Sequence, residues 1–184
     1  MMLNIASYGM VVGHEITHGF DNNGRLFNGF GNYTDWWTAD SLAEFDKRTE
    51  CMIAQYSGYK NEYGDYTNGT LTLGENIADN GGIHVAYRSY EKLKASDPNT
   101  NIQLMTSAKE ITNDQLFFIY LAQDWCQKLS KADAEHLITA DVHSPGLDRI
   151  RGPMSNFPDY ATAFKCSADT PMGKSKTDKR CYIW

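Results

Sequence analysis

The sequence His14-Glu15-Ile16-Thr17-His18 lies within an apolar stretch from about residue 5 to residue 20, which we expect to form a buried helix. Histidines four residues apart leave a helix on the same face, so both imidazoles can bind one zinc ion. Glu15 is turned only slightly from that face and can reach a water molecule on the metal, as a general base must. The alternative is two core histidines beside a surface glutamate, and the motif favours the metal site.

A catalytic zinc site needs a third protein ligand, and the segment 74–79 offers one on a second expected helix that runs from Thr72 to about Ala95. Glu75 and Asp79 are four residues apart and share a face of that helix. One carboxylate can bind the metal while the other accepts a hydrogen bond from a ligand histidine. Acidic pairs at this spacing are more often solvated surface, but the apolar and glycine-rich surroundings favour a site.

A histidine with a carboxylate two residues before it, His143 after Asp141, precedes the turn residues Ser144-Pro145-Gly146. A protonated or hydrogen-bond-donating His143 would suit stabilisation of an oxyanion, with Asp141 orienting the ring. This stretch alone is weak evidence, since a single loop histidine is usually structural or exposed. Two other histidines have no such neighbours and are expected to be structural or exposed: His84 and His136.

Three further helices are expected from apolar residues at helical spacing. One begins at Thr38 or Asp40, one is capped by Thr112 or Asn113 and carries Leu116 through Trp125, and a short one spans about 159–165. We find no alternating strand pattern and no internal repeat. The sequence therefore predicts a mainly α protein.

The 184 residues, 41% of them apolar, are enough for one domain with a sizeable core, which we place at residues 1–184. The net charge of −6 argues against nucleic acid or an anionic membrane as the partner, because either would favour a basic face. No apolar run is long enough to span a membrane.

Disulfides are the expected state of the four cysteines, because none forms a CxxC motif: Cys51, Cys126, Cys166 and Cys181. Glycosylation sequons begin at Asn32 and Asn68, which fits the same extracellular setting, secreted or ectodomain. The first residues do not show the pattern expected of a signal peptide. We therefore expect the chain to be the C-terminal piece of a longer protein.

Four blocks of sequence together resemble the neprilysin and endothelin-converting-enzyme family of zinc metallopeptidases: residues 12–21, 74–82, 141–146 and 181–184. The resemblance runs in order over nearly the whole chain. It implies a thermolysin-like (gluzincin) catalytic lobe, incomplete at the N-terminus, that holds one zinc ion. It also implies endopeptidase action on the amino side of hydrophobic residues in peptide substrates.

The resemblance also implies a role for each motif residue. The zinc ligands would be His14, His18 and Glu75, with Glu15 as the catalytic base and Asp79 as the hydrogen-bond partner of a ligand histidine. His143 resembles the family's transition-state stabiliser, Asp141 its orienting partner, and Arg149 the arginine that contacts the substrate backbone. Arg151 falls outside the match.

In this family the pocket for the substrate's hydrophobic side chain would be lined by Met10, Val11 and the pair Asp124-Trp125. An apolar residue is expected where Asp124 stands. Either the pocket is altered here or the Asp124 side chain turns away from it.

Family members also have a long extracellular segment upstream, and this sequence begins just before the expected zinc-binding helix. By resemblance Cys51 would pair with Cys181, and Cys126 and Cys166 would bond to cysteines of that upstream segment. The second hypothesis for function is therefore a truncated, non-catalytic fragment that binds zinc and peptides or partners without cutting them.

Overall fold

The computed structural model describes residues 1–97, 111–174 and 180–184. Residues 2–20 form a continuous run of helical turns: α1 (Met2–Asn4), a π-helical turn (Ile5–Gly9), α2 (Met10–Thr17) and a tight 3-10 turn (His18–Phe20). The expected helix over residues 5–20 is present, and it begins earlier than predicted. Its first half packs into the core through Met2, Ala6 and Met10, each at most 2% exposed.

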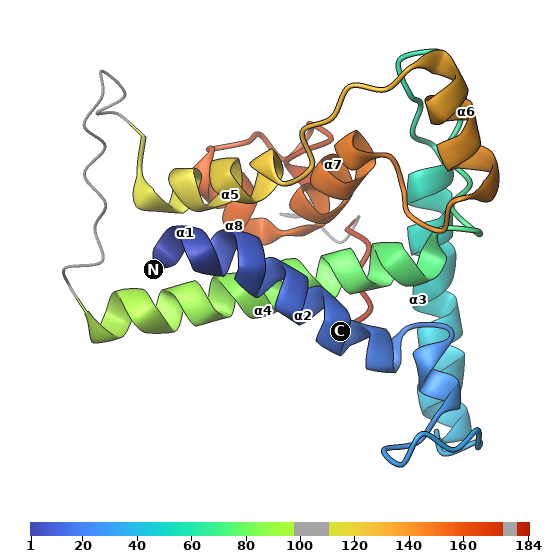
Figure 1. Cartoon of the computed structure of the whole chain (residues 1–184). Helices are drawn as coiled ribbons and strands as arrows, with labels where there is room; N and C mark the ends of the chain where they lie inside the picture. Colours follow the sequence, from blue (N-terminus) through green and yellow to red (C-terminus); the bar gives the residue numbers. More distant parts are fainter. Residues whose placement is uncertain (98–110, 175–179) are drawn as a thin grey trace.

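Helix α4 (Leu73–Ser96) runs across the molecule, and α2 crosses it (Figure 1). The two backbones approach closely where two glycines face each other. A Cβ on Gly82 would lie 2.8 Å from the carbonyl oxygen of Met10, and one on Gly13 would lie 3.0 Å from the carbonyl oxygen of Gly82. No side chain fits at either position, so the crossing depends on glycine.

Three other expected helices are present as α3 (Ala39–Ser57), α5 (Asn113–Gln123) and α8 (Pro158–Ala163). Thr38 caps α3 by accepting a hydrogen bond from the Ser41 amide, and Thr112 forms a capping box with Gln115 at the start of α5. Helix α5 ends earlier than expected, so Trp125 lies in the turn that follows it.

Two helices were not predicted. Helix α6 (Lys131–Ala140) is capped by Ser130, whose hydroxyl accepts from the Asp133 amide. Helix α7 (Gly146–Asn156) begins directly after the expected turn at residues 144–146 and contains Pro153. The proline and the glycine before it obscured this helix in the sequence, since both residues disfavour helix interiors.

The core has two parts. Stacked and edge-on aromatic rings join α4, α5 and residues near α8 around Tyr87, Phe117, Phe118 and Phe157. A second cluster joins α3, α4 and the C-terminal residues, and it contains the disulfide Cys51–Cys181, which confirms that predicted pairing. The closed loop spans 130 residues, so the bond ties the C-terminus to α3.

The described residues contain no strand and only two isolated β-bridges, Phe27–Tyr33 and Lys60–Tyr66. The mainly α prediction is therefore confirmed. Within residues 1–97, 111–174 and 180–184, none of the helices has the length and hydropathy needed to cross a bilayer.

The crossing of α2 and α4 gives a direct test. Gly82→Ala should lower the free energy of unfolding by about 1–3 kcal/mol, because the added methyl group would meet backbone atoms rather than a movable side chain. Chemical denaturation measures the change.

The matched control is Gly29→Ala, because a Cβ on Gly29 has no described neighbour within 4 Å. Equal stability losses in the two variants would contradict the close approach of the helices.

Candidate metal and catalytic site

The two histidines of the α2 segment point their Nε2 atoms at each other, 3.0 Å apart. The Nδ1 atom on the other side of each ring lies beside a carboxylate oxygen: Asp79 Oδ1 at 2.8 Å from His14 and Asp21 Oδ2 at 2.7 Å from His18. A carboxylate only accepts hydrogen bonds, so each Nδ1 must donate. In the neutral rings both Nε2 lone pairs then converge on one point, an arrangement that a cation stabilises.

Glu75, in the first turn of α4, supplies the third group. Its Oε2 lies 3.2 Å from His14 Nε2, and its Oε1 lies 3.5 Å from His18 Nε2. One ligand atom from each of the three residues lies within 4.8 Å of the others. Glu75 Oε2 is buried and accepts no hydrogen bond from the described residues, so it is an acceptor aimed at the ring nitrogens with nothing to satisfy it.

Two imidazole nitrogens and one carboxylate are the ligand set of an open catalytic zinc site. The residues present therefore fit a zinc ion, on the evidence of the converging nitrogens and the unsatisfied Glu75 oxygen.

The charges around this cluster shift two pKa values. Burial of His14 acts to lower its pKa, but the hydrogen bond to Asp79 and the nearby Glu75 carboxylate outweigh it and raise the pKa to about 9. Burial acts to raise the pKa of Glu75, but the nearby His14 ring and the charge of His143 hold it below its usual value. The site therefore favours an ionised Glu75 carboxylate.

Asp79 is fully buried and joins the two helices to α7. Arg149 donates from Nε to Asp79 Oδ2 and from Nη2 to Oδ1, both at 2.8 Å. This bidentate pair neutralises the carboxylate that holds His14. The guanidinium carbon also lies 3.8 Å from the centre of the Trp125 ring. The bond between Arg149 and Asp79 was not predicted from the sequence.

His143 reaches the same cluster from the loop between α6 and α7. Its Nε2 lies 3.2 Å from Glu75 Oε2, and its Nδ1 lies 2.8 Å from Asp141 Oδ1. The backbone amide of His143 also donates to Asp141 Oδ1 and, with the other His143 contacts, keeps the pKa of Asp141 below its usual value despite partial burial. The structure thus brings residues 14, 18, 75 and 143 together.

The remaining site residues of the sequence analysis lie around this cluster in different settings. Glu15 is exposed on α2. Met10 is only 2% exposed and belongs to the core, whereas Val11 is 42% exposed. Trp125 is half-buried, and Asp124, the C-cap of α5, has an exposed side chain.

Residues expected to lie outside the metal cluster do so. His84 packs edge-on against the Phe157 ring, and burial lowers its pKa to about 4, so it is neutral at physiological pH. Asn32 and Asn68 are exposed and therefore accessible to glycosylation. Cys126 is exposed and Cys166 is half-buried.

Sequence reasoning missed Asp21. Its Oδ2 holds His18, while its Oδ1 accepts from the backbone amides of Asn23 and Gly24, both at 2.7 Å. These two amides fix the carboxylate, which in turn fixes the His18 ring. The sequence feature that could have identified Asp21 is its place three positions after His18, about one helical turn further along the chain.

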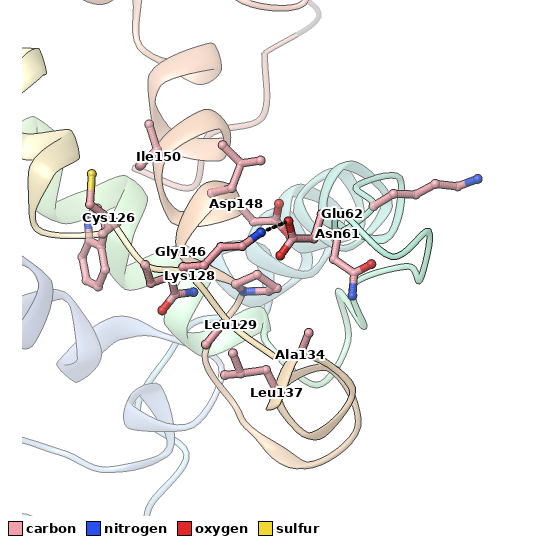
Figure 2. A pocket seen from close by; sticks show the side chains of 15 residues that line it. Asn61, Glu62, Cys126, Lys128, Leu129, Ala134, Leu137, Gly146, Asp148 and Ile150 are labelled. Atoms are coloured by element: carbon pink, nitrogen blue, oxygen red, sulfur yellow. Dashed lines mark hydrogen bonds and ion pairs between the residues drawn. The ribbon is translucent and has the colours of Figure 1, made fainter. Parts of the chain in front are cut away.

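Two adjoining cavities flank the site. A cavity of about 190 Å³ lies beside His143 and Arg149. It shares four lining residues with a larger pocket of about 340 Å³: Trp125, Gln127, Leu137 and Gly146. Figure 2 shows the larger pocket, with Lys128 and Glu62 joined by an ion pair of 2.6 Å beside apolar walls from α6 and α7.

Comparisons with known proteins point to one family. The model of Peptidase family M13 matches residues 1–181. Neprilysin-1 of Caenorhabditis elegans is 42% identical over 183 residues, which are 99% of this chain and 24% of that protein. Human neprilysin is 41% identical over 184 residues, again 99% of this chain and 24% of that protein. The chain thus spans about a quarter of the length of these relatives.

Solved structures are similar over the whole chain. Mycobacterium tuberculosis zinc metalloprotease ZMP1, in complex with inhibitor, superposes with a TM-score of 0.85 at 34% identity, covering 100% of this chain and 28% of that one. The Haemonchus galactose containing glycoprotein complex gives a TM-score of 0.87 at 28% identity, covering 98% and 30%. The family resemblance of the sequence is confirmed: this chain belongs to peptidase family M13.

Proposed function

We propose that this chain forms the zinc-binding and catalytic centre of a metalloendopeptidase that hydrolyses peptides on the amino side of hydrophobic residues. One observation carries the proposal: three ligand atoms from His14, His18 and Glu75 converge, and each histidine is held by its own carboxylate. Such hydrogen bonds fix the tautomer and orientation of metal ligands. Isolated core histidines would not need them.

A bound zinc ion would polarise the scissile carbonyl and lower the pKa of a water molecule to about 7. Glu15 would take a proton from the attacking water on its carboxylate and later give it to the leaving amine. Its exposed place one residue after His14 leaves the carboxylate accessible to the attacking water.

His143 stabilises the developing oxyanion by donating a hydrogen bond from Nε2. Since Nδ1 faces Asp141 Oδ1 and donates to it, donation from Nε2 as well needs a proton on both ring nitrogens. The remaining N–H groups of Arg149 can bind the substrate backbone while Nε and one Nη2 hydrogen hold Asp79.

The preference for hydrophobic residues rests on the family resemblance. The cavity beside His143 and Arg149 supports it, because Trp125 and Leu137 give that cavity apolar walls. Val11 is exposed and available to a substrate, and Asp124 has its side chain in solvent. Met10 would contribute through packing beneath the site.

An extracellular location belongs to the same proposal. The Cys51–Cys181 disulfide and the exposed sequon residues Asn32 and Asn68 support it, since disulfides persist in oxidising compartments. Cys126 and Cys166 are proposed to form disulfides with cysteines outside this sequence.

The second candidate is a non-catalytic zinc-binding chain that binds peptides or partners without cutting them. Peptide cleavage by the 184-residue chain that a chelator abolishes would exclude it. Stoichiometric zinc binding without cleavage would support it.

Replacement of the general base tests the mechanism. Glu15→Gln should keep one zinc ion per chain and lose about 10²–10⁴-fold in the kcat for a peptide with a central hydrophobic residue, because the amide cannot accept the proton. Glu135→Gln, at an exposed glutamate of α6, is the matched control and should keep its activity. Near-normal turnover by Glu15→Gln would refute the role of Glu15.

Zinc binding should release protons. His14 with a pKa of about 9 is protonated at pH 7.5, and a zinc ligand must be neutral, so at least about one proton leaves per zinc ion bound. The apparent zinc affinity should therefore rise with pH up to about 9. Calorimetric titration in two buffers of different ionisation enthalpy counts the protons. A count of zero at pH 7.5 would contradict the assignment of His14 as a ligand.

A further inference from the structure

The loop that carries His143, residues 141–145, lies between α6 and α7. Both hydrogen bonds between His143 and Asp141 lie within this loop. They orient the ring relative to its own backbone, but they cannot fix the loop relative to Glu75, because donor and acceptor move together. Another contact must set the distance of 3.2 Å between His143 Nε2 and Glu75 Oε2.

That contact is a buried hydrogen bond between Ser144 and Asn76, the residues that directly follow His143 and Glu75. The Ser144 hydroxyl donates to Asn76 Oδ1 at 2.7 Å. Ser144 is 3% exposed and Asn76 is fully buried. Ser144 directly follows His143 and Asn76 directly follows Glu75, so one side-chain bond ties the His143 loop to α4 beside the ligand carboxylate.

The Asn76 side chain is itself fixed at its other end. Its Nδ2 donates to Thr72 Oγ1 at 2.8 Å, and Thr72 Oγ1 donates to the carbonyl oxygen of Asn68 at 3.0 Å. The relay runs in one direction, from Ser144 through Asn76 and Thr72 to Asn68. Because Thr72 Oγ1 uses its own proton on Asn68, it can only accept from Asn76, and the amide cannot turn over without losing its bond to Thr72.

We propose that Ser144 and Asn76 are positioning residues that hold His143 at its working distance from the metal cluster. The inference rests on the proposed role of His143 in hydrolysis. Loss of the Ser144 hydroxyl would leave Asn76 Oδ1 buried without its donor and free the middle of the loop. Helix α7 stays anchored by the bidentate bonds of Arg149 to Asp79, so the fold should persist.

The test is Ser144→Ala made in two backgrounds, the natural chain and His143→Gln. In the natural chain, kcat should fall about 10–100-fold with KM nearly unchanged, since displacement of a catalytic group by about 1 Å has effects of this size. In the His143→Gln background, the same change should alter kcat by less than about twofold, because the group that Ser144 positions is gone. Equal losses in both backgrounds would overturn the proposal, as would full activity of Ser144→Ala.

Ser155→Ala is the matched control. Ser155 is 2% exposed, and its hydroxyl donates to the Gly152 carbonyl within α7 at 2.9 Å, so the same deletion is made at a buried site that does not touch the His143 loop. Its kcat should stay within about twofold of the natural chain. A loss equal to that of Ser144→Ala would mean that any buried serine of this region matters alike, and would overturn the proposal.

Hydrogen–deuterium exchange gives a second measurement that needs no catalysis. In Ser144→Ala, the amides of residues 141–144 should exchange faster while those of α4 and α7 keep their protection. Unchanged exchange in the loop would overturn the anchoring role. The exchange result holds whether or not the chain cleaves peptides, so failure of this inference and failure of the proposed function are distinguishable.

Discussion

The site depends on the close crossing of α2 and α4, where Gly13 and Gly82 leave no room for side chains. Two helices with ordinary side chains at the contact lie about 8–10 Å apart, and glycine allows them to come nearer. At that short distance the carboxylates of α4 reach the histidines of α2 directly. Glu75 meets both Nε2 atoms, and Asp79, one turn later, meets the far side of His14.

This arrangement buries charged groups, and specific partners neutralise them. Asp79 is fully buried between His14 and the guanidinium of Arg149. Removal of one member would leave an unpaired buried charge, which is strongly destabilising. The same contacts that neutralise the carboxylate also bring α7 to the site. The same interactions therefore orient the His14 ring and hold α7 against the site.

Much of this site could be predicted from local spacing. The helical period places His14 and His18 on one face, and places Glu75 and Asp79 on one face, without any tertiary information. The family resemblance predicted the disulfide Cys51–Cys181 and the grouping of the motif blocks in one site. The start of α5 followed from local capping chemistry at Thr112.

The rest depends on tertiary contacts that no local pattern carries. The Arg149–Asp79 pair joins residues 70 positions apart, and the Ser144–Asn76 bond joins residues 68 apart. Asp21 was missed because its role requires two backbone amides that become available only in the folded turn. Helix α7 was missed because Pro153 weakens its local signal, while burial of most of its residues stabilises it.

The central claim is that His14, His18 and Glu75 bind one zinc ion. X-ray absorption spectroscopy of the zinc-loaded chain tests it most directly, because the method reports the identity and distance of the metal's nearest atoms. We expect two imidazole nitrogens at about 2.0–2.1 Å and carboxylate oxygen at about 2.0–2.2 Å, with no sulfur. A sulfur shell near 2.3 Å, or the signature of a single imidazole, would contradict the claim.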